Sequence, residues 1–496
     1  MARPPPREKR SALYSGQAHC LYGLRPAGAG LRFGTRPGWR GRFLRNRLMM
    51  EMHMKKLKLQ DVAWALLVLQ CVAVFFLMRP WQPNSDSTEY LQLAQALSNG
   101  AYGSVTPAGF EPEALRPPGY PLFLWLNLHV AHLPIAGVIV LQLLMYLASL
   151  YLVARYLRKR AIPPLLFLTL AVGYIFAAVY SSAVLAEAPA MLALTSAAVL
   201  LAGGEPGWRR LAAIGLICGL AILTRPDLLL LPVVVAGVVA GGAIWTKRIR
   251  QDFWKAAVPL VAAGLVLLPY SLWNYDKFGR LSPLPVAGAV GTSLYLSTWS
   301  HLPLEDLNAL YRGEVTPRAR EAGLGTAVAA VNREIGAPEL TAPWTPYSYK
   351  TREQQIRATR VLAAAAVERI RADPGMYLRH VASNVWRLWN TSEYPARTPL
   401  PAEMALRLFS ALVAALGLIG AGMSFLRVRD WPLPAGPAAI LLYLPAVHVW
   451  LHTEARYTAP ARPLLLMFAA VFLIWAWNRS GAGRFLPVRL QRMLGQ

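Results

Sequence analysis

Long apolar stretches, separated by short basic segments, make up most of this chain. A helix that crosses a membrane needs roughly 20 mostly apolar residues, and ten windows of this kind can be marked between residues 61 and 477. They lie at about 61–79, 135–154, 161–181, 185–202, 210–224, 227–245, 256–273, 404–426, 435–451 and 460–477. The pattern predicts an all-α polytopic membrane protein with about ten transmembrane helices.

Two long polar stretches, at 80–134 and 274–403, interrupt the apolar pattern. Both are too long and too regularly patterned to be plain loops. The first predicts an amphipathic helix over 86–97, because apolar residues recur on one helical face: Leu91, Ala94 and Leu97. The second predicts helical segments at about 317–335 and 351–372, followed by a segment at 373–390. The aromatic residues of this last segment suit a membrane interface.

Lys and Arg in the short loops predict the orientation, because cytoplasmic loops are enriched in basic residues. With ten spans, the basic segments all fall on one side of the membrane: 1–58, 155–160, 209–210, 247–255, 427–429 and 479–492. Both termini are therefore predicted to be cytoplasmic, and both polar stretches to lie outside. We expect a basic, disordered tail over 1–58, a transmembrane domain over 59–478 and a second basic tail over 479–496.

The composition agrees with a membrane protein. Hydrophobic residues make up 55% and charged residues 15% of the chain, and the mean hydropathy is +0.35, which excludes an ordinary soluble protein. The net charge is +26, but the first tail holds fourteen Lys or Arg against two Glu, so +12 of it is local. Cationic flanks of spans explain this basicity better than nucleic-acid binding does. Four methionines near the end of the tail offer alternative starts: Met49, Met50, Met52 and Met54.

Asp86 follows the first predicted span on the outer side. A carboxylate there, shielded by apolar surface, can accept the proton of an attacking hydroxyl. The alternative is structural: an acid in the first turn of a helix is favoured by the helix dipole, with Ser85 or Asp86 as the cap and Glu89 completing a capping box. Position alone leaves both interpretations open.

Glu187 lies at the predicted outer mouth of the third and fourth spans, in the apolar segment SSAVLAEAPAMLAL. An acid within such a segment is costly and usually faces a polar cavity or a partner. The alternative is a turn residue that simply reaches water.

Three arginines, Arg116, Arg225 and Arg456, are predicted at the same outer boundary. A guanidinium group is permanently charged and binds phosphate through a fork of N–H groups. Any one of the three alone is explained as well by snorkelling to lipid headgroups, but three arginines beside two or three acids are not. They predict a site for a phosphorylated ligand embedded in the membrane. The sequence contains no glycine-rich phosphate loop, HExxH or GxSxG motif and no metal-ligand spacing of histidines, so nucleotide-driven chemistry is not expected.

The first outer stretch also carries a family resemblance. An Asp, a Glu-Tyr pair three residues later and Leu-x-x-Ala-x-x-Leu-x-x-Gly are followed by RPPGYPLFL. This series resembles the first outer loop of the GT-C membrane glycosyltransferases. It is closest to the bacterial branch that resembles protein O-mannosyltransferases and the aminoarabinose transferases of lipid A. Glu187, Asp373 to Leu378 and Glu454 to Pro463 fit the same pattern, so the resemblance spans about residues 60–478.

The resemblance implies a GT-C-like fold and an inverting transfer of a sugar from a polyprenyl-phosphate donor. The transfer would take place on the outer face of a bacterial cytoplasmic (inner) membrane. The acceptor stays open between a lipid, a polysaccharide and a protein; membrane lipids are the other expected partners, and nucleic acid is not one.

The resemblance also implies roles for single residues. Asp86 takes the place of the catalytic acid of that loop and would act as base on the acceptor hydroxyl, and Glu187 would be a second acid that orients acceptor or base. Arg116 takes the place of a basic residue that contacts the lipid phosphate, and we expect Arg456 and Arg225 to add phosphate contacts. Further substrate contacts are expected from Glu89, Tyr90, Tyr120 and Tyr457.

Two positions depart from the aminoarabinose transferases. Where they have an Arg before the Tyr, this chain has Glu89, which puts one phosphate contact in question. Where they have an acid before Lys-Pro-Pro, this chain has Leu115, which removes a metal ligand. No required metal or other cofactor is therefore predicted.

A transporter or flippase for a lipid-linked sugar is the main alternative, because charged residues at span ends also line permeation routes. A transporter is expected to place several ionisable residues near the middle of the bilayer and to contain paired broken helices. Here the ionisable residues cluster at one predicted face, which favours the enzyme.

Overall fold

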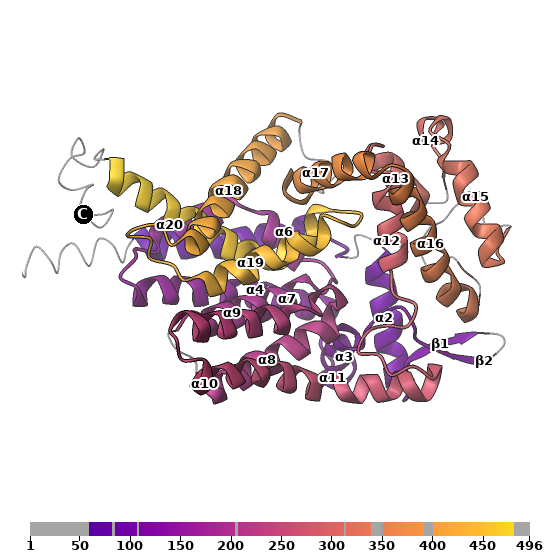
Figure 1. Cartoon of the computed structure of the whole chain (residues 1–496), viewed down its shortest axis with the longest axis horizontal. Helices are drawn as coiled ribbons and strands as arrows, with labels where there is room; N and C mark the ends of the chain where they lie inside the picture. Colours follow the sequence, from indigo (N-terminus) through magenta and orange to yellow (C-terminus); the bar gives the residue numbers. More distant parts are fainter. Residues whose placement is uncertain are drawn as a thin grey trace, which may run out of the picture. The chain divides into compact units, whose positions relative to one another are not determined.

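In the residues that it describes, the computed structural model is almost entirely helical (Figure 1). These residues are 59–81, 85–106, 109–203, 207–311, 314–338, 349, 351–390 and 400–480. The tail predicted over 1–58 and all but the first two residues of the tail predicted over 479–496 lie outside them.

Six helices among the described residues are long and apolar enough to cross a membrane. They are Leu59–Leu77, α4 (Ile135–Lys159), η2 with α9 (Pro226–Leu228 and Leu231–Trp245), α10 and η3 with α11 (Ile249–Asp252, Phe253–Ala256 and Ala257–Phe278), α18 (Leu400–Leu426), and η5 with α20 (Ala455–Ala461 and Arg462–Ser480). They confirm the predicted all-α, multi-pass membrane protein.

The other four predicted windows form shorter apolar helices. Three of them are α7 (Glu187–Leu201), α8 (Trp208–Thr224) and α19 (Ala435–His448), with 15, 17 and 14 residues. The window at 161–181 is divided into α5 (Leu165–Gly173) and α6 (Phe176–Ser181), because the backbone leaves the helical region at Tyr174. Ten apolar segments are therefore present, but only six have the length of a full span.

The apolar helices pack closely with one another. α8 runs along α11 and contacts α7, and α7 runs along α4. Gly215 of α8 is so near α11 that a Cβ there would lie 2.5 Å from the Pro259 carbonyl oxygen. Small residues allow such approach in membranes, where packing between side chains holds the helices together.

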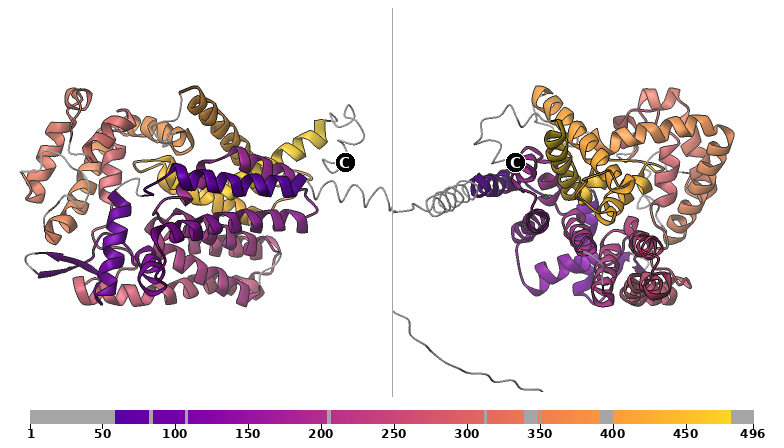
Figure 2. Two further views of the ribbon diagram at one scale, coloured as in Figure 1. Left: turned by 180° about the vertical axis from the view of Figure 1, so that it is seen from behind. Right: turned by 60° about the vertical axis from the view of Figure 1, so that its left-hand side comes forward.

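The first polar stretch folds at one end of this bundle. It begins with α2 (Ser85–Ser98), which confirms the helix predicted over 86–97. An antiparallel hairpin that the sequence pattern did not predict follows, β1 (Gly103–Thr106) and β2 (Gly109–Pro112), and then α3 (Gly119–Trp125) and the π-helical η1 (Leu126–Val130). In both ribbon views α2, α3 and the hairpin lie at the opposite end of the bundle from the C-terminal end of α20 (Figures 1 and 2).

The described part of the second polar stretch contains six helices from residue 290 onward: α12 (Val290–Ser297), α13 (Leu304–Tyr311), α14 (Pro317–Glu321), α15 (Leu324–Ile335), α16 (Arg352–Ala372) and α17 (Pro374–Asn390). α12 to α16 share a hydrophobic core of their own, which includes Tyr295, Trp299 and Leu362. The helix predicted over 317–335 is interrupted at Gly323, whose φ of 81° ends α14 and precedes α15. The helix predicted over 351–372 is confirmed by α16, which begins at a capping box of Thr351 and Gln354.

α17 is amphipathic, as the sequence pattern predicted. Tyr377 and Leu388 are buried on one face, whereas Leu378, Val385 and Trp386 are 60%, 45% and 59% exposed on another. An exposed apolar stripe on a helix just before a membrane span suits the interface of a bilayer.

The ends of several helices meet where the first polar stretch folds. α7 and α9 begin there, and α8 and α19 end there, while η5 leads into α20. Because Glu187, Arg225 and Arg456 sit at these helix ends, residues far apart in sequence come together at one end of the bundle.

Candidate active site

Asp86 lies between two arginines that come from distant parts of the chain. Its Oδ1 is 2.5 Å from Nη2 of Arg116, and its Oδ2 is 2.9 Å from Nη1 of Arg456. Asp86 is in the first turn of α2, Arg116 precedes α3, and Arg456 lies in η5. One carboxylate therefore joins the first outer stretch to the last membrane helix, 370 residues away.

The Arg116 side chain also contacts the rest of α2. Glu89, one turn after Asp86, accepts hydrogen bonds from Arg116 Nη2 (2.7 Å) and Nε (3.2 Å). The Arg116 guanidinium lies over the ring of Tyr90, 5.1 Å from its centre. Glu89 thus orients the guanidinium through hydrogen bonds, and Tyr90 does so through a cation–π contact.

The backbone of Arg116 is fixed by its neighbours. Its N–H donates to Glu113 Oε1, and its carbonyl accepts from the hydroxyl of Tyr102 at 2.8 Å. Gly119, three residues on, packs directly on the end of α8, where a Cβ would lie 2.5 Å from the Leu223 carbonyl. The RPPG segment therefore needs a glycine to bring α3 against the bundle.

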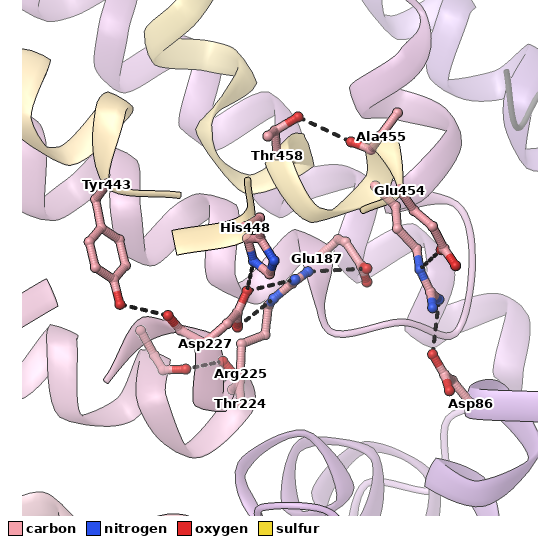
Figure 3. Close-up of polar contacts among 12 residues, drawn as sticks. Asp86, Glu187, Thr224, Arg225, Asp227, Tyr443, His448, Glu454, Ala455 and Thr458 are labelled. Carbon is pink, nitrogen blue, oxygen red and sulfur yellow. Dashed lines mark hydrogen bonds and ion pairs between the residues drawn. The ribbon is translucent and has the colours of Figure 1, made fainter. Parts of the chain in front are cut away.

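Arg456 has a second acid of its own. Its Nε lies 2.6 Å from Oε2 of Glu454, and Glu454 Oε1 lies 3.8 Å from Nε2 of His452. In Figure 3, Asp86 and Glu454 lie on either side of one guanidinium group, which is that of Arg456. In all, three carboxylates, Asp86, Glu89 and Glu454, surround two guanidinium groups.

A second cluster lies deeper and is centred on Arg225 (Figure 3). Arg225 pairs with Glu187 Oε1 at 3.2 Å and with Asp227 Oδ2 at 2.9 Å. His448 Nε2 is 2.9 Å from the same Asp227 oxygen, and the hydroxyl of Tyr443 donates to the Asp227 carbonyl. The ends of α7, α8, α9 and α19 are joined in this way.

The two clusters are in contact through an aromatic ring. His448 stacks on Tyr457, with ring centres 4.8 Å apart, and Tyr457 follows Arg456 in η5. The position of Arg456 is therefore coupled to the Asp227–His448 pair.

Exposure distinguishes the central ion pairs of the two clusters. The side chains of Asp86 and Arg116 are each 21% exposed, whereas those of Glu187 and Arg225 are 6% and 10% exposed. The Asp86–Arg116 pair is therefore nearer to solvent, and the Glu187–Arg225 pair forms a buried floor.

Local charges set the protonation of the acids around Arg456. Burial alone would raise the pKa of Asp86, but the charges and hydrogen bonds of Arg116 and Arg456 outweigh it and hold this pKa well below its usual range. Burial also opposes ionisation of Glu454, yet Arg456 and His452 lower its pKa to about 2. Both carboxylates are therefore ionised at neutral pH.

Two helices of the second polar stretch, α12 and α17, hold the loop that precedes Arg456. Asn384 of α17 is fully buried, and its amide donates to the carbonyls of Val449 and Leu451 at 3.0 Å each. The backbone N–H of His452 donates to the Ser293 carbonyl of α12 at 2.7 Å. α12 and α17 thus position the loop between α19 and η5.

We expect Asn384→Ala to raise the KM for the donor about five- to tenfold, because two hydrogen bonds that position the Arg456 loop are lost. The catalytic rate at saturating donor should change less. Asn332→Ala is the matched control, since Asn332 is equally buried but bonds to Tyr349 within the outer helices. Equal effects of the two variants on KM would show that Asn384 acts only through stability.

The predicted site residues divide into three groups. Asp86, Glu89, Tyr90, Arg116 and Arg456 come together around one carboxylate. Glu187 and Arg225 belong to the deeper cluster, which Tyr457 joins through His448. Tyr120 is fully buried and donates to Gln142 Oε1 at 2.7 Å, so it contributes to the core below Tyr90.

Asp227, His448, Glu454 and Asn384 are parts of these clusters that we did not predict as site residues. Asp227 and His448 each interrupt an apolar run, which is the same signal that drew attention to Glu187. Asn384 has no such signal. Among the described residues, no group of three or more His, Cys, Asp or Glu side chains is arranged to hold a metal ion.

Solved structures of two proteins are similar to this chain. One is the archaeal oligosaccharyltransferase AglB from Archaeoglobus fulgidus in complex with an inhibitory peptide and a dolichol-phosphate, at 14% identity and a TM-score of 0.43 over 86% of this chain. The match covers 51% of AglB, so this chain spans about half the length of that protein. The other is ArnT from Cupriavidus metallidurans bound to undecaprenyl phosphate, at 13% identity and a TM-score of 0.34, covering 85% of this chain and 80% of that one.

No protein-family model matches the sequence, and no curated protein matches it.

Proposed function

We propose that this protein transfers a sugar from a polyprenyl-phosphate donor to an acceptor hydroxyl at the outer face of the membrane. The observation that carries the proposal is the pair of guanidinium groups of Arg116 and Arg456, held on either side of one carboxylate at the open end of a helix bundle. Two guanidinium groups that converge on one oxyanion also suit a phosphate.

The arginines would act on the leaving group. When the bond between the anomeric carbon and the phosphate oxygen breaks, its electron pair stays on the phosphate. Arg116 and Arg456 would stabilise that growing charge through N–H groups already oriented by Glu89 and Glu454. Because both guanidinium groups are fixed by carboxylates, little reorganisation is needed during the reaction.

Asp86 would act as the base. The acceptor oxygen forms the new bond to the anomeric carbon from the face opposite the phosphate, so the configuration is inverted, and its proton passes to the Asp86 carboxylate. Glu187 would orient the acceptor from the buried floor, held there by Arg225. Arg225 itself remains a candidate phosphate contact, but its pairing with Glu187 and Asp227 favours a positioning role.

The aromatic residues would complete the site. Tyr90 supports Arg116 from below, and Tyr457 links Arg456 to His448. Burial raises the pKa of Tyr90 to about 12, so its hydroxyl stays neutral and is available to a sugar as a hydrogen-bond donor. That no metal is required remains an expectation from the sequence, and activity measured in a chelator tests it.

We expect Arg116→Ala to lower donor use, measured as kcat/KM, by about ten- to hundredfold, because a charge-assisted contact to phosphate is lost. Stability should change little, since Arg116 is partly exposed. Undecaprenyl phosphate carrying a sugar is the donor to test first. Arg79→Ala is the control, because Arg79 lies just before the same polar stretch but contacts Phe76 and Trp81. Normal kinetics in a folded Arg116→Ala protein would remove Arg116 from the site.

A further inference from the structure

The Asp86 carboxylate occupies the position that a bound phosphate would need. Its two oxygens are divided between Arg116 and Arg456, at 2.5 and 2.9 Å. A phosphate that binds both guanidinium groups would place two of its oxygens in the same arrangement. The lipid phosphate and Asp86 therefore compete for the same N–H groups.

The charges around the position between Arg116 and Arg456 strengthen the competition between Asp86 and the phosphate. Arg116 and Arg456 carry two positive charges, and Asp86, Glu89 and Glu454 carry three negative ones. A phosphate that approaches this group of five side chains meets a net charge of about −1. If Asp86 leaves, the other two acids still balance the arginines, and the phosphate no longer faces a carboxylate between them.

The surroundings let Asp86 leave without releasing the arginines. Glu89 holds Arg116 through two hydrogen bonds, and Glu454 holds Arg456 through Nε. Asp86 contacts both arginines, and at 21% its side chain is more exposed than those of Glu89 and Glu454, at 15% and 12%. When this one side chain turns away from the arginines, the phosphate position opens.

We propose that Asp86 is an internal competitor of the lipid phosphate and thereby sets the order of the reaction; this rests on the proposed function. The donor phosphate displaces Asp86 from Arg116 and Arg456, and the released carboxylate turns to the acceptor. After transfer, the proton taken from the acceptor hydroxyl passes from Asp86 to the phosphate of the spent lipid. The ionised Asp86 then returns to the arginines and helps the product to leave.

A competing Asp86 and an Asp86 that only orients the arginines predict opposite changes in the affinity for the spent lipid. Without the negative charge at residue 86, the spent lipid should bind more tightly, because its competitor is gone. If Asp86 only orients the arginines, the same change should weaken binding.

The test is the affinity of the purified full-length protein in lipid nanodiscs for undecaprenyl phosphate. We expect Asp86→Asn to bind about tenfold more tightly than the wild type, and Asp86→Ser to do the same if the asparagine variant does not fold. Glu111→Gln is the control: it removes one negative charge from β2 in the same outer stretch and should bind like the wild type. In Asp86→Asn combined with Arg456→Ala, the gain should disappear.

Equal or weaker binding by both Asp86 variants, with clear binding by the wild type, overturns the competition and leaves the proposed function standing. An equal gain in Glu111→Gln also overturns it, because the effect is then one of net charge. If the wild type neither binds undecaprenyl phosphate nor transfers sugar from it, the proposed function fails, and the competition fails with it.

Discussion

Asp86→Asn is expected to slow sugar transfer by about 10²- to 10⁴-fold at saturating donor, the usual contribution of a general base. Asparagine keeps the shape of the side chain, but one of the two acceptor oxygens becomes an NH2 group, so it can accept from only one of the two arginines and cannot take the proton of the acceptor hydroxyl. The measurement is the single-turnover rate with labelled donor and excess acceptor, which separates chemistry from lipid release.

Two controls make this result specific. Glu111→Gln removes a carboxylate from the same outer stretch without touching either arginine, and its rate should equal that of the wild type. Thermal unfolding of Asp86→Asn should stay close to that of the wild type. If Asp86→Asn transfers sugar at the normal rate, Asp86 is only an acid that favours the start of α2, and the base lies elsewhere.

The second large effect is expected at Arg225, as a loss of stability. Arg225→Met should lower the free energy of unfolding by about 3–5 kcal/mol, because breaking a buried ion pair leaves an uncompensated charge. Here two carboxylates, the buried Glu187 and the half-buried Asp227, lose the same partner. Chemical or thermal unfolding of the purified variant in detergent, followed through tryptophan fluorescence, measures the change.

A neutralised version of the cluster provides the control. Combining Arg225→Met with Glu187→Gln and Asp227→Asn removes all three charges and should restore much of the lost stability. Activity should not return, since the proposed orienting acid is gone. A fully stable Arg225→Met protein whose donor KM alone has risen would instead make Arg225 a phosphate contact.

Hydropathy and residue spacing predicted much of the fold, because the helices form from signals between residues that are close in the sequence. The apolar windows, the helix that begins near Asp86 and the helix after Thr351 all follow from local periodicity and capping. The break at Tyr174 and the hairpin before Arg116 did not follow, since two short strands rich in Gly and Pro carry almost no strand signal.

The same limit applies to the site. Asp86, Arg116 and Arg456 could be proposed because they gather at one predicted boundary, on the side opposite the basic loops. Their pairing could not be derived, because Asp86 meets Arg456 across 370 residues and Asp227 meets His448 across 221. The structure also changes the interpretation of Asp86, which is already ion-paired with both arginines expected to bind phosphate.

The most direct test of the central claim is label transfer from a panel of polyprenyl-phosphate sugars to membrane extracts. Purified wild type and Asp86→Asn are compared in the same assay. The account predicts that the wild type transfers label from at least one donor and releases polyprenyl phosphate, while Asp86→Asn binds that donor and transfers almost none. If the wild type transfers label from no donor but moves the same lipids across vesicle membranes, the protein is a transporter and the proposed chemistry is wrong.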